Sequence, residues 1–375
     1  MNTLETVHEW LRFMVLRKAS DLFLTAGFTP AVKLNGKVTG ITQTTLTPTD
    51  TATLAKLVMN ERQQKEFEAT HDCNFAIHVD GVGRFRVNVF VQQGRTGIVF
   101  RHINTNIPRI EDLNLPRNLK DITMMPRGLI IVTGATGSGK STTLAAMVGH
   151  RNQSAQEHII TVEDPIEYVH VHGKSIVTQR EVGIDTDTWE TALKNTLRQA
   201  PDVIMIGEIR DRETMQYAMA YAETGHLCLS TIHANNANQT LDRILSFFPK
   251  ERREQLLLDL SMNLRAIVSQ RLLSRMDGKG RVPAVEIMLN SPLIADLILQ
   301  GRLDELKDVM TRSRDMGMQT FDQHLFDLFT HGVVSAEDAL RNADSFNDLR
   351  LKIKLHVRDG KGEAPLSGLD HLDLI

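Results

Sequence analysis

Cysteine, aromatic side chains and long apolar runs are all scarce in this chain of 375 residues. It has two cysteines, Cys73 and Cys228, and its aromatic content is 5%. Two cysteines so far apart form neither a CxxC metal site nor a disulfide framework, so we expect a reducing compartment and no zinc. No stretch approaches the roughly 20 apolar residues of a membrane helix, and the first residues lack a signal-peptide pattern. The sequence therefore predicts a cytoplasmic protein.

An excess of charge of one sign is missing too. The chain has 43 Lys and Arg residues against 46 Asp and Glu residues, which gives a formal net charge of -3 at pH 7. This balance argues against a strongly basic nucleic-acid binder and against a disordered acidic chain. With 41% hydrophobic residues, the composition is that of a globular protein. Its length suggests two or three domains.

The first part of the chain mixes predicted helices and strands in an α/β pattern. Apolar residues recur with a helical period over 4–17, and Asn35-Gly36 between two short apolar runs predicts a hairpin over 32–38. A helix is expected from Thr47 to about Ala69. Three strands are expected over 74–78, 83–92 and 97–102. We expect these elements to form one small α/β domain that ends near residue 103.

The rest of the chain alternates short apolar runs with longer amphipathic segments. Four apolar runs are typical of buried strands: 129–132, 158–162, 203–206 and 227–230. Such alternation predicts a parallel sheet covered by helices, followed from about Pro249 by mostly helical chain. The expected divisions are a domain over 1–103, a linker over 104–120, a core over 121–285, a helical subdomain over 286–356 and a disordered tail over 357–375.

A glycine-rich segment directly follows the first of these apolar runs. It matches the pattern GxxxxGK[ST], in which glycines let backbone N–H groups turn toward phosphate oxygens. The residues of this segment and the one after it are Gly134, Ala135, Thr136, Gly137, Ser138, Gly139, Lys140, Ser141 and Thr142. We expect Lys140 to hold the β- and γ-phosphates of ATP and Ser141 to bind Mg²⁺.

Two acidic residues follow other predicted strands. Glu163 comes directly after the run over 158–162, and Glu208 follows the run over 203–206 with one glycine between. Ligands bind at the carboxyl ends of strands in open α/β sheets, so both acids are expected beside the phosphate loop. ATP hydrolysis needs a carboxylate near Mg²⁺ and a group that orients water. We assign the first role to Glu208 and the second to Glu163, with an exchange of roles, or a helix-cap role for a single acid, as alternatives.

Two histidines, His226 and His233, flank the predicted strand over 227–230. Either could sense the γ-phosphate or carry a proton, although a lone histidine is more often structural. Four arginines of the first domain are candidates for the same phosphate: Arg84, Arg86, Arg95 and Arg101. An arginine from outside the nucleotide domain can neutralise charge that develops on the γ-phosphate. A solvated strand face is the alternative for these arginines.

Taken together, these motifs resemble those of the secretion-type hexameric ATPases, and within them the PilT/PilU type IV pilus retraction ATPases. The resemblance runs from about residue 1 to 355. It rests on a Walker A loop over 134–141, an Asp box over 161–167 with Arg180-Glu181-Val182-Gly183 after it, a Walker B box over 202–211 and a His box over 223–233.

The resemblance implies a PAS-like N-terminal domain and a RecA-like P-loop ATPase domain with a helical C-terminal end, assembled as a homo-hexamer. ATP would bind between the two domains, where the arginines of the first domain would complete the site. The implied function is pilus retraction and twitching motility, with force passed to an inner-membrane pilus platform protein. The implied location is the cytoplasmic face of the inner membrane. A nucleic-acid motor is disfavoured, because the core is net acidic and shows no aromatic-basic stacking platform.

Two features depart from the PilT type. That type carries an Ala-Ile-Arg-Asn-Leu motif, whereas this chain has Leu293-Ile294-Ala295-Asp296-Leu297 and continues past its helical region. Both features resemble PilU-type members, which support retraction by a paralogous ATPase. An accessory motor is therefore expected, and a docking subunit with dispensable ATP turnover is the alternative. Extension and secretion ATPases usually carry a four-cysteine zinc site, which two cysteines do not allow.

Overall fold

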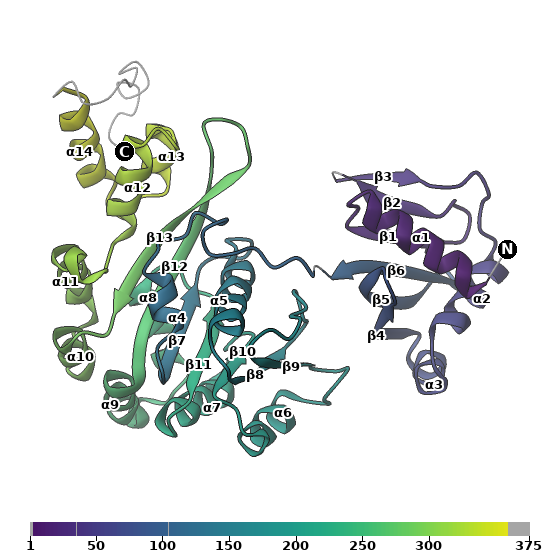
Figure 1. The fold of residues 1–375 in the computed structure, drawn as a ribbon, viewed down its shortest axis with the longest axis horizontal. Helices are drawn as coiled ribbons and strands as arrows, with labels where there is room; N and C mark the ends of the chain where they lie inside the picture. Colours follow the sequence, from purple (N-terminus) through teal and green to yellow (C-terminus); the bar gives the residue numbers. More distant parts are fainter. Residues whose placement is uncertain (1–2, 35, 104, 359–375) are drawn as a thin grey trace. The chain divides into compact units, whose positions relative to one another are not determined.

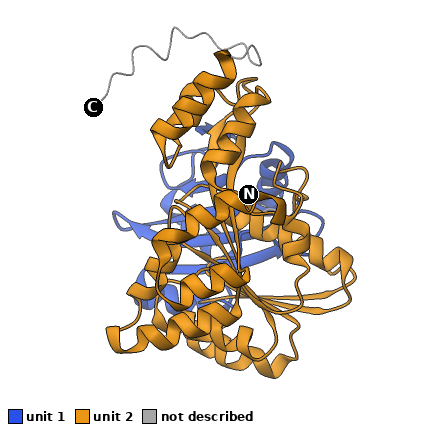
Figure 2. Ribbon diagram, turned by 90° about the vertical axis from the view of Figure 1, so that its left-hand side faces the viewer, with its two compact units in different colours: residues 1–106, 166–171, 183–185 blue, residues 107–165, 172–182, 186–375 orange. Residues whose placement is uncertain are grey.

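The structure is a computed structural model that describes residues 3–34, 36–103 and 105–358. The chain divides into two compact units (Figure 2). Unit 1 comprises Met1–Asn106, Ile166–Val171 and Gly183–Asp185, and unit 2 comprises Ile107–Pro165, His172–Val182 and Thr186–Ile375. Within the described residues, each helix is too short or too polar to cross a membrane. The tail expected over 357–375 lies outside the described residues from 359 onward.

Unit 1 is an antiparallel sheet with three helices, and its strand order is β3-β2-β1-β6-β5-β4 (Figure 1). Buried residues of the first two helices pack with Phe85, Val87 and Phe100 on one face of the sheet. The elements are α1 (Leu4–Leu16), β1 (Asp21–Thr25), β2 (Ala31–Leu34), β3 (Lys37–Gly40), α2 (Pro48–Val58), α3 (Glu61–Thr70), β4 (Asp72–Val79), β5 (Gly83–Gln92) and β6 (Arg95–Ile103).

The helix predicted over 4–17 and the hairpin predicted over 32–38 are confirmed by α1 and by the pairing of β2 with β3. The single helix predicted from Thr47 to Ala69 is wrong, because two helices occupy this stretch. The Thr47 hydroxyl accepts from the backbone N–H of Asp50, and Asn60 makes the same kind of cap with Gln63. A second capping box in the middle of a helical pattern starts a new helix, which is why α3 begins at Glu61.

Unit 2 is built on a seven-stranded sheet with the order β13-β12-β7-β11-β10-β8-β9. All neighbouring strands are parallel except β12 and β13, which form an antiparallel hairpin. The strands are β7 (Gly128–Thr133), β8 (His158–Glu163), β9 (Ile176–Glu181), β10 (Val203–Ile206), β11 (Leu227–Ile232), β12 (Leu264–Ser274) and β13 (Arg281–Leu289). The four predicted strands of this sheet are thereby confirmed.

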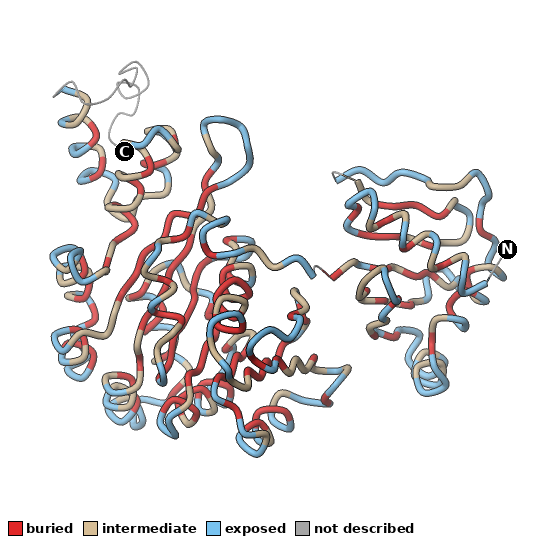
Figure 3. The backbone as a smooth tube through the Cα atoms, viewed as in Figure 1, coloured by how far each residue is buried: buried red, intermediate tan, exposed pale blue. Residues whose placement is uncertain are grey.

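Helices cover both faces of this sheet, so its central strands are buried along their whole length (Figure 3). Ile130 and Val132 pack with residues of α4 and α5, whereas Leu129 and Ile131 pack with residues of α7 and α9. The helices are α4 (Leu119–Thr123), α5 (Lys140–Ser154), α6 (Trp189–Thr196), α7 (Arg212–Glu223), α8 (Ala237–Ser246), α9 (Arg253–Asn263), α10 (Pro292–Leu299), α11 (Leu306–Arg312), α12 (Phe321–Thr330), α13 (Ala336–Arg341) and α14 (Phe346–Arg358).

The expectation of mostly helical chain from Pro249 is wrong over the long hairpin of β12 and β13. Asp277-Gly278-Lys279-Gly280 forms its turn, with Gly278 and Gly280 both at positive φ. Beyond the hairpin the chain is helical from α10 to α14, as expected. Helices α12 to α14 pack around the end of the hairpin through a small core that includes Leu273, Val282 and Phe321.

A buried carboxylate, Glu286 on β13, joins the hairpin to helix α8. Its Oε1 accepts a hydrogen bond of 2.8 Å from the backbone N–H of Ala237, at the start of α8, and one of 3.0 Å from the Ser269 hydroxyl. Burial raises the pKa of Glu286 to about 7, and nearby Asp344 acts in the same direction. The hydrogen bonds from Ala237 and Ser269 and the charge of Lys307 oppose this rise.

Glu286 should therefore make the stability of the protein depend on pH. Its folded pKa is raised above the ordinary value of 4.5, so its stabilising contribution is complete below pH 4.5 and is lost as pH rises through 7. The loss is about 3 kcal/mol of unfolding free energy. Denaturant unfolding at pH 5 and pH 8 should show a smaller loss in Glu286→Gln than in the wild type. The exposed Glu337→Gln control should keep the wild-type loss, and equal losses in all three proteins would refute this role.

Candidate active site

The predicted phosphate loop connects the buried strand β7 to helix α5, and its shape depends on glycine. Gly134, Gly137 and Gly139 have φ values of 153°, 78° and 93°. A Cβ atom on Gly134 would lie 2.4 Å from the Ser138 hydroxyl and 2.5 Å from the backbone oxygen of Gln270. The loop can therefore curl against strand β12 only if residue 134 has no side chain.

Lys140 is the first residue of α5, and its side chain is folded back into the loop. Its Nζ donates to the backbone oxygens of Gly134 and Ala135 at 2.9 and 3.0 Å. The residue is 8% exposed, and burial lowers the pKa of its ammonium group. A buried cation gains from an anionic partner, which phosphate oxygens would supply at this position.

Other groups of the loop fit a phosphate ligand as well. The Ser138 hydroxyl is buried and has no hydrogen-bond partner within the protein. Gly139 caps α5 without a side-chain hydrogen bond, so the N-terminal end of the helix is left to bind an anion. Ala135, Thr136, Gly137 and Ser141 are exposed around these groups. The Ser141 hydroxyl, on the first turn of α5, has the oxygen chemistry of a Mg²⁺ ligand.

Glu163 is the last residue of β8, at the carboxyl ends of the parallel strands, where the phosphate loop also lies. Its side chain is buried, and Oε1 accepts from the Thr161 hydroxyl at 2.7 Å and from Gln179 Nε2 at 3.1 Å. Gln179 is on the neighbouring strand β9. These two hydrogen bonds hold the orientation of the carboxylate.

Glu208 and His233 meet at the same edge, after β10 and β11. His233 Nε2 lies 3.2 Å from Glu208 Oε2, and Glu208 also forms an ion pair with Arg210. The pKa of His233 lies below its ordinary 6.5, chiefly because of burial and then because of the positive charges of Lys140, Arg210 and Arg243. His233 is therefore neutral at pH 7, and either ring nitrogen can serve as donor or acceptor.

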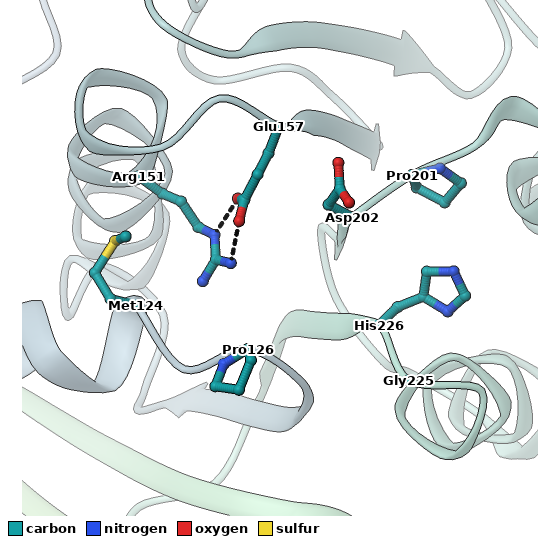
Figure 4. Close-up of a pocket in the computed structure, with 8 residues that line it drawn as sticks. All are labelled: Met124, Pro126, Arg151, Glu157, Pro201, Asp202, Gly225 and His226. Carbon is teal, nitrogen blue, oxygen red and sulfur yellow. Dashed lines mark hydrogen bonds and ion pairs between the residues drawn. The ribbon is translucent and has the colours of Figure 1, made fainter.

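His226, the other histidine predicted to sense the γ-phosphate or carry a proton, lies apart from the group formed by Glu208 and His233. It precedes β11, where its backbone oxygen accepts from Gly128 at the start of β7. The phosphate loop leaves the other end of β7, and the six residues of β11 span about 20 Å. Figure 4 shows His226 beside Arg151, Glu157 and Asp202, around a cavity of about 360 Å³.

The four predicted arginines all lie on one face of the sheet of unit 1. Arg86 on β5 is the register partner of Arg101 on β6, and Arg84 is two residues before Arg86. Arg101 donates to the buried Asp21 at 2.8 Å, and Arg84 lies 3.9 Å from Asp185. Arg95 is at the other end of β6, about 20 Å from Arg101 along the strand. Unit 1 thus clusters three of the arginines and separates the fourth.

The sequence-based reasoning missed Gln270 of β12 and Thr133 of β7. Gln270 is 3% exposed and joins the loop to α5, because its Nε2 donates to the Ser138 backbone oxygen and its Oε1 accepts from Thr143. The Thr133 hydroxyl donates to the backbone oxygens of Ile232 and Ala234, on either side of His233. The Gly-rich turn of the β12–β13 hairpin is a sequence signal for the strand that carries Gln270, but it does not give the register of that strand with β7.

Residues 3–325 match the family model described as "Type II/IV secretion system protein". The chain is 59% identical to "Type IV pilus ATPase PilU" of Pseudomonas aeruginosa over 92% of this chain and 90% of that protein. It is 41% identical to "Type IV pilus retractation ATPase PilT" of the same organism over 90% of this chain and 98% of that protein.

A solved structure is similar over nearly the whole chain as well. It is the crystal structure of the pilus retraction motor PilT with bound ADP, with a TM-score of 0.85 and 42% sequence identity. The match covers 93% of this chain and 98% of that one. The fold is therefore a small α/β N-terminal domain followed by a RecA-like ATPase domain with a helical C-terminal end.

The close contact of Gly134 with β12 yields a stability prediction. Gly134→Ala should lower the unfolding free energy by a few kcal/mol, because the methyl group meets a backbone oxygen and the φ value is unfavourable. Gly137→Ala meets no atom within 4 Å and has only the unfavourable φ, so it should cost about 1 kcal/mol. Denaturant unfolding without nucleotide measures both. Equal losses would show that the contact with Gln270 does not constrain the loop.

Proposed function

The chain belongs to the Type II/IV secretion system protein family and to its type IV pilus ATPases, and from this premise we propose that it is an ATP-hydrolysing motor that assists pilus retraction. It acts in twitching motility as the accessory paralogue of the main retraction ATPase. One observation carries the proposal. The carboxyl ends of the parallel strands bring together a phosphate loop, two carboxylates and a neutral histidine. These are the groups that phosphoryl transfer to water requires.

The residues of the loop bind the nucleotide. Backbone N–H groups of the loop and the N-terminal end of α5 face the phosphates, and Lys140 exchanges its carbonyl partners for the β- and γ-phosphate oxygens. The buried Ser138 hydroxyl, which has no hydrogen-bond partner within the protein, gains one from the same oxygens. Binding therefore pairs a buried hydroxyl that the loop alone leaves without a partner.

Ser141 and Glu208 are the residues that would hold Mg²⁺, directly or through water. When bound, this ion neutralises charge that develops on the phosphate oxygens. Glu163, oriented by Thr161 and Gln179, accepts a proton from the attacking water, and His233 keeps Glu208 in place. The roles of Glu163 and Glu208 can exchange, because both carboxylates lie at the same edge of the sheet.

The assembly and its location complete the proposal. Six copies form a ring in which the arginines of unit 1, foremost Arg84, Arg86 and Arg101, stabilise the γ-phosphate. The ring works beside a paralogous retraction ATPase and passes force to a pilus platform protein at the cytoplasmic face of the inner membrane. The names of two relatives, a type IV pilus ATPase and a type IV pilus retraction ATPase, support a role in the pilus system.

A second candidate function is a docking subunit whose own ATP turnover is dispensable. The observation that favours it is Ala295 on α10, which stands where PilT-type members have an arginine. Ala295 is half-buried, and the neighbouring Leu293 is 54% exposed, so the change alters an accessible face. Both candidate functions use the surface of α10. They differ in whether retraction of the pilus needs ATP hydrolysis by this chain.

ATP turnover should depend on Lys140. Purified protein with Mg²⁺ and ATP should release phosphate, and Lys140→Ala should reduce kcat by about 100-fold or more, because the γ-phosphate loses its buried cation. Lys174→Ala, a change at an exposed loop position, is the control and should keep the wild-type rate. Unchanged turnover in Lys140→Ala would rule out the proposed site.

The need for hydrolysis is tested in cells that contain the paralogous ATPase. Glu208→Gln keeps the size of the side chain but removes its charge, so it should abolish turnover and impair twitching while still assembling with the paralogue in a pull-down. Full twitching with the inactive variant would instead favour the docking subunit.

A further inference from the structure

Two consecutive residues of β12, Gln270 and Arg271, connect the phosphate loop to the C-terminal helices. Strand β12 is parallel to β7, and its register places Ser269 opposite Thr133, so Gln270 lies level with the start of the loop. Gln270 Nε2 donates to the Ser138 backbone oxygen at 2.8 Å, and its Oε1 accepts from Thr143 at 2.7 Å. A displacement of the loop must therefore act on this residue of β12.

Arg271 points to the other side of the strand, because successive side chains alternate. Its guanidinium lies over the ring of Phe321 on α12, 3.9 Å from the ring centre. It donates to Asp344, between α13 and α14, at 2.6 Å and to the backbone oxygen of Asn342. It also donates to the backbone oxygen of Asn235 at 3.3 Å, two residues after His233. One side chain thus joins three segments that are distant in sequence.

The acidic partner of Arg271 belongs to a wider charged group. Asp344 also accepts from Lys307 of α11 at 2.8 Å. Burial alone would raise the pKa of Asp344, but the hydrogen bonds and charges of Lys307 and Arg271 hold it below its ordinary value. The carboxylate is therefore ionised at neutral pH, and Arg271 and α11 are held to the same anion.

We propose that Arg271 is a positioning residue that transmits the nucleotide state of the phosphate loop to helices α11 to α14, with Gln270 as its link to the loop. This inference rests on the proposed function, in which the loop binds ATP. Phosphate binding draws Lys140 from Gly134 and Ala135, and the Ser138 carbonyl moves with the loop. Gln270 follows that carbonyl, and Arg271 shares a peptide unit with Gln270.

The planar guanidinium is what this junction requires. It stacks on an aromatic ring and donates in several directions within its plane, whereas a lysine ammonium provides only a point charge. Arg271→Lys therefore keeps a positive charge next to Asp344. It removes the stacking on Phe321 and the set of hydrogen bonds that the planar guanidinium donates. Phe321→Leu removes the stack and leaves the hydrogen-bond partners of the guanidinium in place, with a smaller side chain in the core around the hairpin. Arg275→Ala is the matched control, because Arg275 follows the same strand but pairs with Asp277 in the hairpin turn.

Hydrogen exchange of the full-length protein tests the proposal, with and without Mg²⁺ and the non-hydrolysable analogue adenosine 5′-(β,γ-imido)triphosphate. In the wild type and in Arg275→Ala, the analogue should change exchange in α12 to α14 by about fivefold or more. In Arg271→Lys the change should fall below about twofold, while the analogue's Kd stays within about threefold of the wild type. Phe321→Leu should give an intermediate change.

The outcomes separate this inference from the proposed function. A wild type that binds no analogue overturns the proposed function and the inference with it. A wild type that binds the analogue without any change in α12 to α14 overturns the inference alone. So does an Arg271→Lys variant that keeps the full change, or one that loses analogue binding by more than about tenfold, since Arg271 would then act on binding itself.

Discussion

The parallel register of β7 and β11 is the constraint on which the site depends. Gly128 pairs with Leu227 at one end of the two strands and Thr133 with Ile232 at the other. The Thr133 hydroxyl also joins β7 to the segment that follows β11, because it donates to the backbone oxygens of the residues before and after His233. The loop and the His233 segment therefore leave the sheet together, and strands β10 and β8 bring Glu208 and Glu163 to the same edge in the same way.

The charged groups at this edge are already paired within the chain. Lys140 bonds to carbonyls of the loop, Glu208 to Arg210 and His233, and Glu163 to Thr161 and Gln179. A buried charge without a partner would cost several kcal/mol, so these contacts let the site fold before any ligand is present. Nucleotide binding then becomes an exchange of partners. In that exchange the contacts that Lys140 makes with Gly134 and Ala135 are the ones given up.

Local patterns made the centre of the sheet and the phosphate loop predictable. Four apolar runs and the spacing of three glycines and Lys140 carry that information within short stretches. The hairpin of β12 and β13 was not recognised, because Ser269, Gln270 and Arg271 interrupt its apolar pattern and its best signal was the Gly-rich turn. The role of Gln270 depends on register with β7, which no local pattern contains. His226 and His233 look equivalent in the sequence because they flank the same strand, whereas only the residue after the strand lies at its carboxyl end.

The surface of α10 is separate from the contacts that hold the phosphate loop. Helix α10 is anchored by buried Ile294, Leu297 and Ile298, and it packs against α9. The phosphate loop is held instead by Gln270 of β12, on a different element of the unit. Half-buried Ala295 on α10 therefore lies on a different element from the residue that holds the loop. The chain keeps a phosphate loop, two carboxylates and a histidine together at the carboxyl ends of its strands, independently of the surface of α10. This arrangement fits a subunit that hydrolyses ATP and relies on a paralogue to retract the pilus.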